Sequence, residues 1–145
     1  MRKTELQTPA ILVDLDILDQ NIRKYQDLCN KYNKQLWPMI KTHKSSEIIN
    51  MQVEAGATGF LCGTLDECEK LAEMGIQNIM YAYPVASEVN IKRVLALSQK
   101  CNFIIRLDNL QGAQMLDAEA EKAGTKVNYT IIVDSGLHRF GILPD

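Results

Sequence analysis

Short apolar runs alternate with amphipathic segments along most of the 145-residue chain. None of the runs shows the strict apolar–polar alternation of a strand with one face in solvent, and each is bounded by turn-forming residues. This pattern is typical of parallel strands buried on both faces. The five runs that we interpret as such strands lie at 36–40, 59–62, 79–83, 103–107 and 129–133, and a shorter run at 10–13, also a plausible strand, follows Pro9.

The segments between the runs carry helix signals. The first helix is predicted from apolar residues at spacings of three and four, and its expected N-cap is Asp16. Thr64 and Glu67 have the spacing of a capping box. The first stripe consists of Leu15, Leu18, Ile22, Tyr25 and Cys29. The other expected helix starts are Ser46, Thr64, Ser87 and Asn109, and the expected glycine stops are Gly56, Gly75 and Gly124.

Regular alternation of strand and helix predicts an α/β fold with a parallel sheet. Two architectures are compatible with this pattern, an open doubly wound sheet and a (β/α)8 barrel. A whole barrel needs about 250 residues, whereas five βα units fill this chain. If the fold is a barrel, we expect the chain to hold only its N-terminal part.

Composition excludes several function classes. The formal net charge is −2 and the isoelectric point is near 5.7, so the chain lacks the basic surface of a nucleic-acid binder. No apolar run approaches the roughly 20 residues of a membrane span, and no apolar segment follows the start as in a signal peptide. The four cysteines form no CxxC pair. We therefore expect reduced thiols and a cytoplasmic location.

The most unusual strand end is Lys41-Thr42-His43-Lys44, directly after the apolar run at 36–40. Active sites of both candidate architectures lie at the carboxyl ends of the strands. Desolvation and neighbouring positive charge lower the pKa of a lysine amine, and such an amine can form a Schiff base with an aldehyde or ketone. The alternative interpretation is a solvated basic turn.

A second candidate follows the last run, where Arg139 lies between Gly136 and Gly141. Glycines let a backbone approach a ligand closely, and a guanidinium suits a phosphate, carboxylate or phenolate; the alternative is a surface arginine in a turn. The two histidines, His43 and His138, give no zinc spacing with the cysteines, so no metal site is expected within these residues.

Tyr83 lies near the carboxyl end of the run at 79–83. From its position, we interpret it as packing at the mouth of the sheet rather than as a proton carrier.

Taken together, these segments resemble the N-terminal barrel of fold-type III pyridoxal-phosphate enzymes, in the branch of D-threonine aldolase and D-serine dehydratase. The resemblance implies that Lys41 carries pyridoxal 5′-phosphate as a Schiff base and is the catalytic residue. It implies that Arg139 lies near the phenolic oxygen of the cofactor, and places His43 and Tyr83 among the cofactor-binding residues. The chain departs from the family at Trp37 and Met39, where members often carry arginine and histidine. The matching segments are Thr8-Pro9-Ala10, Pro38-x-Ile40-Lys41-Thr42-His43-Lys44, Ala82-Tyr83-Pro84 and Val133-Asp134-Ser135-Gly136-x-x-Arg139-x-Gly141.

The function implied by the resemblance is a lyase acting on D-3-hydroxy amino acids, working as a homodimer when full length. Residues 1–13 would be a strand that pairs with a second, C-terminal β-domain, and residues 14–145 would be a partial barrel. A divalent metal, zinc or manganese, would be held by residues of that second domain, and the 145 residues alone are expected to be a poor catalyst. Alternatives are an amino-acid racemase, a non-catalytic pyridoxal-phosphate homeostasis protein of the same fold, and an open-sheet module without the cofactor.

Overall fold

Four parallel strands form one sheet in the order in which they occur along the chain. The computed structural model describes residues 2–144. The strands are β1 Phe60–Cys62, β2 Asn78–Tyr81, β3 Asn102–Leu107 and β4 Asn128–Ile131. The helices are α1 Leu15–Lys31, α2 Ser46–Ala55, α3 Leu65–Glu73, α4 Glu88–Ser98 and α5 Leu110–Lys122, with short 3-10 turns at Lys3–Glu5 and Ile40–Thr42. The predicted α/β fold with a parallel sheet is confirmed.

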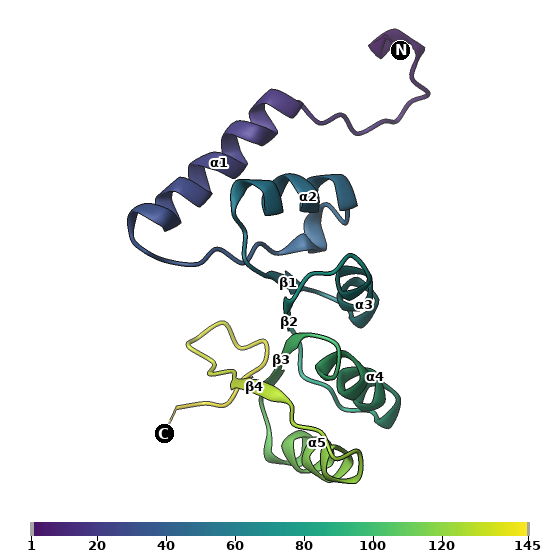
Figure 1. The fold of residues 1–145 in the computed structure, drawn as a ribbon, viewed down its shortest axis with the longest axis vertical. Helices are drawn as coiled ribbons and strands as arrows, with labels where there is room; N and C mark the ends of the chain where they lie inside the picture. The colour runs from purple at the N-terminus through teal and green to yellow at the C-terminus, as the bar shows by residue number, and fades with distance from the viewer. Residues whose placement is uncertain (1, 145) are drawn as a thin grey trace.

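Helices α3, α4 and α5 connect successive strands and lie along one face of the sheet, whereas α1 and α2 lie beside its β1 end (Figure 1). Three expected N-caps are confirmed, because the side chains of Thr64, Ser87 and Asn109 each accept a hydrogen bond from the amide three residues on. The three expected glycine stops all have the positive φ that ends a helix.

One expected N-cap is wrong by two residues. Asp14, not Asp16, caps α1, because its backbone is extended and its Oδ1 accepts two first-turn amides, each at 3.1 Å. Asp16 lies inside the first turn, where its negative charge interacts favourably with the positive end of the helix dipole. The expected helix start at Ser46 is confirmed, and the preceding Ser45 is its N-cap, because its backbone is extended and its hydroxyl accepts a hydrogen bond from the Ile48 amide.

The run at 36–40 is not a regular strand, so the first of the five predicted buried strands is wrong. Met39 forms a single parallel bridge with Leu61, and the carbonyl of Pro38 accepts a hydrogen bond from the Leu61 amide at 2.9 Å. Pro38 has no amide hydrogen to donate to a ladder, and the chain turns into the 3-10 segment at Ile40. The run therefore lies beside β1 without extending the sheet by a full strand.

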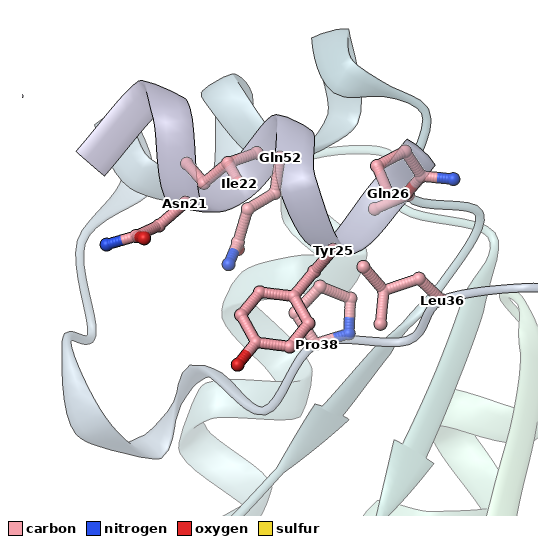
Figure 2. A pocket seen from close by; sticks show the side chains of 8 residues that line it. Asn21, Ile22, Tyr25, Gln26, Leu36, Pro38 and Gln52 are labelled. Carbon is pink, nitrogen blue, oxygen red and sulfur yellow. The ribbon is translucent and has the colours of Figure 1, made fainter. Parts of the chain in front are cut away.

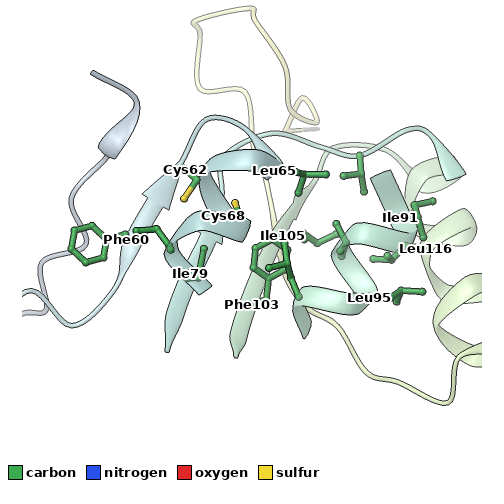
Figure 3. Packing of buried hydrophobic residues seen from close by; sticks show 14 of the residues in the cluster. Phe60, Cys62, Leu65, Cys68, Ile79, Ile91, Leu95, Phe103, Ile105 and Leu116 are labelled. Atoms are coloured by element: carbon green, nitrogen blue, oxygen red, sulfur yellow. The ribbon is translucent and has the colours of Figure 1, made fainter. Parts of the chain in front are cut away.

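The core lies between the sheet and α3, α4 and α5 (Figure 3). Along β3, Phe103, Ile105 and Leu107 are buried in this core, and the intervening residues face the other way. Register places Phe60 of β1 opposite Ile79 of β2, and Ile79 opposite Phe103. Burying each such side chain contributes about 1.5–3 kcal/mol, so this apolar layer fixes how the strands align.

The β4 end of the sheet carries exposed apolar side chains. Tyr129 and Ile131 occupy the same face as the buried β3 residues, yet each is 59% exposed because no helix among residues 2–144 covers them. An apolar groove of about 1010 Å³ runs between β4 and α5. On the face that carries the helices, the sheet is thus covered only from β1 to β3.

The segment at 10–13 pairs with no strand in the described part of the chain, and Ile11 is 96% exposed. Its expected pairing with a second domain remains a prediction. No helix within residues 2–144 combines the length and apolar character needed to span a bilayer.

Core packing predicts a sharp difference between two leucines in helices. Leu71→Ala should lower the free energy of unfolding by about 2–5 kcal/mol, because Leu71 is fully buried in α3. Leu110→Ala is the matched control, since Leu110 is 73% exposed in α5. Urea unfolding followed by circular dichroism measures both, and equal losses would contradict the core described here.

Candidate active site

Lys41 lies in the turn that follows the extended run beside β1. Ile40, 3% exposed, anchors the turn in the core. The Lys41 side chain then passes directly over Gly63, the residue after β1: a Cβ on Gly63 would lie 2.9 Å from Cδ of Lys41. Any larger residue at Gly63 would displace the lysine stem, so the glycine fixes the path of the amine.

Lys41, Tyr83 and Arg139 converge on one oxygen atom. Nζ of Lys41 donates to the Tyr83 hydroxyl at 3.3 Å, and Nη2 of Arg139 donates to the same oxygen at 2.9 Å. The three residues follow the first apolar run, β2 and β4 respectively. Parallel strands end at the same edge of the sheet, which is why residues up to 98 positions apart meet there.

The two cations change the acidity of the phenol between them. The hydrogen bonds from Lys41 and Arg139 lower the pKa of Tyr83 below its ordinary value, because both donors stabilise the phenolate. The guanidinium carbon of Arg139 also lies 5.3 Å from the centroid of the Tyr83 ring, and the Phe140 ring packs edge-on against that ring at 5.7 Å. Tyr83 is therefore more than packing at the mouth, because it bridges the two cations.

The loop that carries Arg139 is held by Asp134. Its Oδ1 accepts from the amides of Gly136 and His138 at 2.9 and 3.0 Å, and these bonds lower the pKa of Asp134. His138 Nδ1 also lies 3.1 Å from Oδ2 of Asp134. Gly141 closes the loop with φ +119°, and a Cβ there would lie 2.8 Å from the Asp134 nitrogen. The second glycine of the motif is thus required by backbone contact.

His43 is not brought into this group. Its Nδ1 accepts from the Ser45 amide at 3.2 Å, and within residues 2–144 its buried Nε2 has no hydrogen-bond partner. Burial lowers the pKa of His43. The ring supports the start of α2 and makes no hydrogen bond to Lys41, Tyr83 or Arg139 in the described chain.

Sequence reasoning missed the role of Glu67. The predicted capping box is formed on one side only, since Thr64 Oγ1 accepts from the Glu67 amide, but the Glu67 carboxylate accepts from the Gly63 amide at 2.7 Å. Its other oxygen lies 3.0 Å from Nζ of Lys44. Burial tends to raise the pKa of Glu67, but the Gly63 amide and Lys44 outweigh it and lower the pKa. Its place on the buried side of α3, among Leu65 and Cys68, was the available signal.

Two further features of the described residues lie apart from this group. A pocket of about 250 Å³ between α1 and α2 is lined by Tyr25, Leu36 and Pro38, and none of its lining residues belongs to the Lys41 group (Figure 2). Within residues 2–144, no cluster of three or more histidine, cysteine, aspartate or glutamate side chains could hold a metal ion.

An amine and a guanidinium on one oxygen suit a particular ligand chemistry. In pyridoxal 5′-phosphate, the aldehyde and the phenolic oxygen are neighbouring substituents of one ring, so a lysine that bonds the aldehyde needs a cation close by for the phenolate. Lys41 and Arg139 provide this pair of groups. The residues present therefore fit the cofactor.

The fold and the site define an α/β protein whose reactive side chains lie at the carboxyl end of a parallel sheet. Residues 13–145 match the alanine racemase N-terminal domain, and the chain belongs to that family, whose members are fold-type III pyridoxal-phosphate enzymes. The resemblance drawn from the sequence motifs is confirmed.

Relatives within this family match almost the whole chain. The 3-hydroxy-D-aspartate aldolase of Paracoccus denitrificans (strain Pd 1222) is 30% identical over 144 residues, covering 98% of this chain and 37% of that protein. The D-threo-3-hydroxyaspartate dehydratase of Delftia sp. (strain HT23) is 31% identical over 141 residues, covering 97% and 37%. The crystal structure of D-threonine aldolase from Filomicrobium marinum shares the fold, with a TM-score of 0.92 at 24% identity over 99% of this chain and 39% of that one. The chain thus spans about 37% of the length of the relatives.

The geometry predicts that Tyr83 ionises at lower pH than an ordinary tyrosine, because two cations favour its phenolate. Ultraviolet difference titration of wild type against Tyr83→Phe isolates its transition. Lys41→Met and Arg139→Met should each move that transition to higher pH, whereas Arg23→Met, in exposed α1, should leave it unchanged. A transition insensitive to both Lys41 and Arg139 would contradict the contacts in this site.

Proposed function

We propose that this protein is a pyridoxal-phosphate-dependent lyase of D-3-hydroxy amino acids, with Lys41 holding the cofactor through a Schiff base. The observation that carries the proposal is the meeting of the Lys41 amine and the Arg139 guanidinium at one oxygen atom. In this proposal Arg139 takes the phenolic oxygen of the cofactor, and Tyr83 orients both side chains.

The bound cofactor supplies an electron sink for bonds at the α-carbon of an amino acid. With the cofactor bound, Lys41 would be the residue that exchanges a proton at that carbon. Arg139 keeps negative charge on the phenolic oxygen by a charge-assisted hydrogen bond. Gly63 leaves room for the lysine stem, because a side chain at that position would collide with it.

The substrate class is supported by the names of the relatives. The Paracoccus protein is an aldolase of 3-hydroxy-D-aspartate, and the Delftia protein is a dehydratase of D-threo-3-hydroxyaspartate. Both substrates are D-amino acids with a hydroxyl on the β-carbon. We propose the same class here, with a zinc or manganese ion held by residues outside these 145 and a homodimer as the working assembly. The four free thiols support a reducing compartment such as the cytoplasm.

The first test of this function is the position of the cofactor. Borohydride reduction of the chain mixed with pyridoxal 5′-phosphate should label the peptide that contains Lys41, as read by mass spectrometry. Lys41→Ala should remove the label, because its amine is the one held beside Arg139 through Tyr83. Lys44→Ala should retain the label with reduced occupancy, since Lys44 pairs with Glu67.

A label that persists in Lys41→Ala, or disappears only in Lys44→Ala, would show that the wrong lysine was chosen. Product analysis of cofactor-loaded wild type that has not been reduced with borohydride then identifies the reaction. From 3-hydroxy-D-aspartate, cleavage between the α- and β-carbons gives glycine and glyoxylate, and dehydration gives oxaloacetate and ammonia. Formation of the diastereomer inverted at the α-carbon, without the products of cleavage or dehydration, would favour a racemase and contradict the lyase proposal.

The role of Arg139 leads to a second expected result. Arg139→Ala should weaken binding of pyridoxal 5′-phosphate by about ten- to a hundredfold, the loss of one charge-assisted hydrogen bond of about 1.5–3 kcal/mol. Equilibrium dialysis measures the affinity, with Arg23→Ala as the control because Arg23 pairs with Asp19 on exposed α1. If Arg139→Ala binds the cofactor with unchanged affinity, Arg139 is a surface arginine without a role in cofactor binding.

A further inference from the structure

Five residues form one row on the inner face of the sheet, the face opposite α3, α4 and α5. The row runs Lys41, Gly63, Ala82, Arg106 and Thr130. Arg106 lies opposite Thr130 in the β3–β4 ladder. The β2–β3 register, continued by two residues, places Ala82 opposite Arg106, and Lys41 crosses Gly63 at the first end of the row. The lysine of the proposed site and Arg106 therefore belong to the same layer.

Alternation along β3 fixes the direction of Arg106. Its neighbours Ile105 and Leu107 are buried in the helix-covered core, so Arg106 faces the other side of the sheet. Figure 1 shows the segment after β4, which carries Arg139, on that same side. Arg106 thus lies on the same face as the loop that positions Arg139.

Between Lys41 and Arg106 the row holds only a glycine and an alanine. Lys41 and Arg106 are three strand spacings apart, about 14 Å along the sheet. No side chain larger than the Ala82 methyl stands between them in this row. Two long cationic side chains can therefore reach toward one small ligand from opposite ends.

Arg106 lacks the partners that a guanidinium normally has. Within residues 2–144 its buried Nε has no hydrogen-bond partner, and neither does the buried Oγ1 of Thr130 beside it. By contrast, Arg93 pairs with Asp66 and Glu69. Among the ion pairs of the described chain, none involves Lys41, Arg106 or Arg139. Buried donors without partners cost free energy, and a carboxylate would satisfy both side chains.

We propose that Arg106 and Thr130 bind a second carboxylate of the substrate, so that the preferred substrate is a dicarboxylic D-3-hydroxy amino acid. This inference rests on the proposed function, because it places the amino group of the substrate at the Lys41 end of the row. The guanidinium accommodates a carboxylate with two parallel hydrogen bonds, and the threonine hydroxyl donates a third. A substrate with a methyl group in that position leaves these donors unpaired, which sites of this kind reject strongly.

The test compares two substrates in the cofactor-loaded full protein. Arg106→Met should lower kcat/KM for 3-hydroxy-D-aspartate by about ten- to a hundredfold and change that for D-threonine by less than about twofold. Arg106→Lys, which keeps the positive charge, should recover part of the preference. Arg23→Met is the control for loss of an arginine elsewhere.

The outcomes separate specificity from stability. If Arg106→Met lowers kcat/KM equally for both substrates, so that their ratio is unchanged, Arg106 has a structural role and the proposal is overturned. If Arg106→Met does not fold, as judged by circular dichroism, the Arg106→Lys and Thr130→Val variants provide the test. Each should have a smaller preference for the dicarboxylic substrate than the wild type.

A second measurement does not depend on the cofactor. D-malate has two carboxylates and no amine, and D-2-hydroxybutyrate has one carboxylate. Calorimetry on protein without pyridoxal phosphate should show tighter binding of D-malate in wild type, and no difference between the two ligands in Arg106→Met. If Lys41 fails to trap the cofactor but this difference is present, the proposed function falls and the carboxylate site stands. If trapping succeeds without the difference, only the carboxylate site falls.

Discussion

Burial of alternate strand residues against one layer of helices is the constraint on which the rest of the structure depends. Phe60, Ile79, Phe103 and Ile105 pack on α3, α4 and α5, and the period of two in a strand sends the intervening residues to the opposite face. A slip of one residue in any strand would exchange the two sets. The apolar core thus determines indirectly that Arg106 shares a face with the proposed site.

The turn that carries Lys41 is stabilised by the carboxylate of Glu67 rather than by strand-to-strand hydrogen bonds. The run before Lys41 has only one bridge to β1, so the strand pairing that fixes the other strand ends is weak here. Glu67 also stabilises this turn, because its carboxylate accepts a hydrogen bond from the amide of Gly63, over which the Lys41 stem passes, and pairs with Lys44, three residues after Lys41. Its pKa is lowered, so this support is present above the ordinary glutamate pKa and is lost as the pH falls through the folded value.

Much of the fold could be predicted from the sequence because apolar runs, caps and glycine stops are local signals. The errors have local causes too: Pro38 cannot donate to a ladder, and a helix cap depends on backbone conformation, which Asp14 adopts and Asp16 does not. Of the candidate residues, Lys41, Tyr83 and Arg139 meet because all three follow strand ends. Arg106 was missed because its role depends on the strand register, and Glu67 was missed although its place on the buried side of α3 was a signal in the sequence. His43 was close in sequence to the lysine, but the turn directs it toward Ser45.

The distribution of charge on the two sides of the sheet points to a functional reason for the unpaired cations. On the helix side, Arg93 is neutralised by two carboxylates and Lys122 by one. On the inner side, Asp134 is the acid of the Arg139 loop, yet it is committed to backbone amides and His138, and it leaves Arg139 to Tyr83. Like charges gathered without counterions oppose folding. Such an arrangement is expected where a ligand, rather than a side chain, supplies the negative charge. A binding site of this kind lowers the stability of the unliganded protein in exchange for affinity toward the ligand.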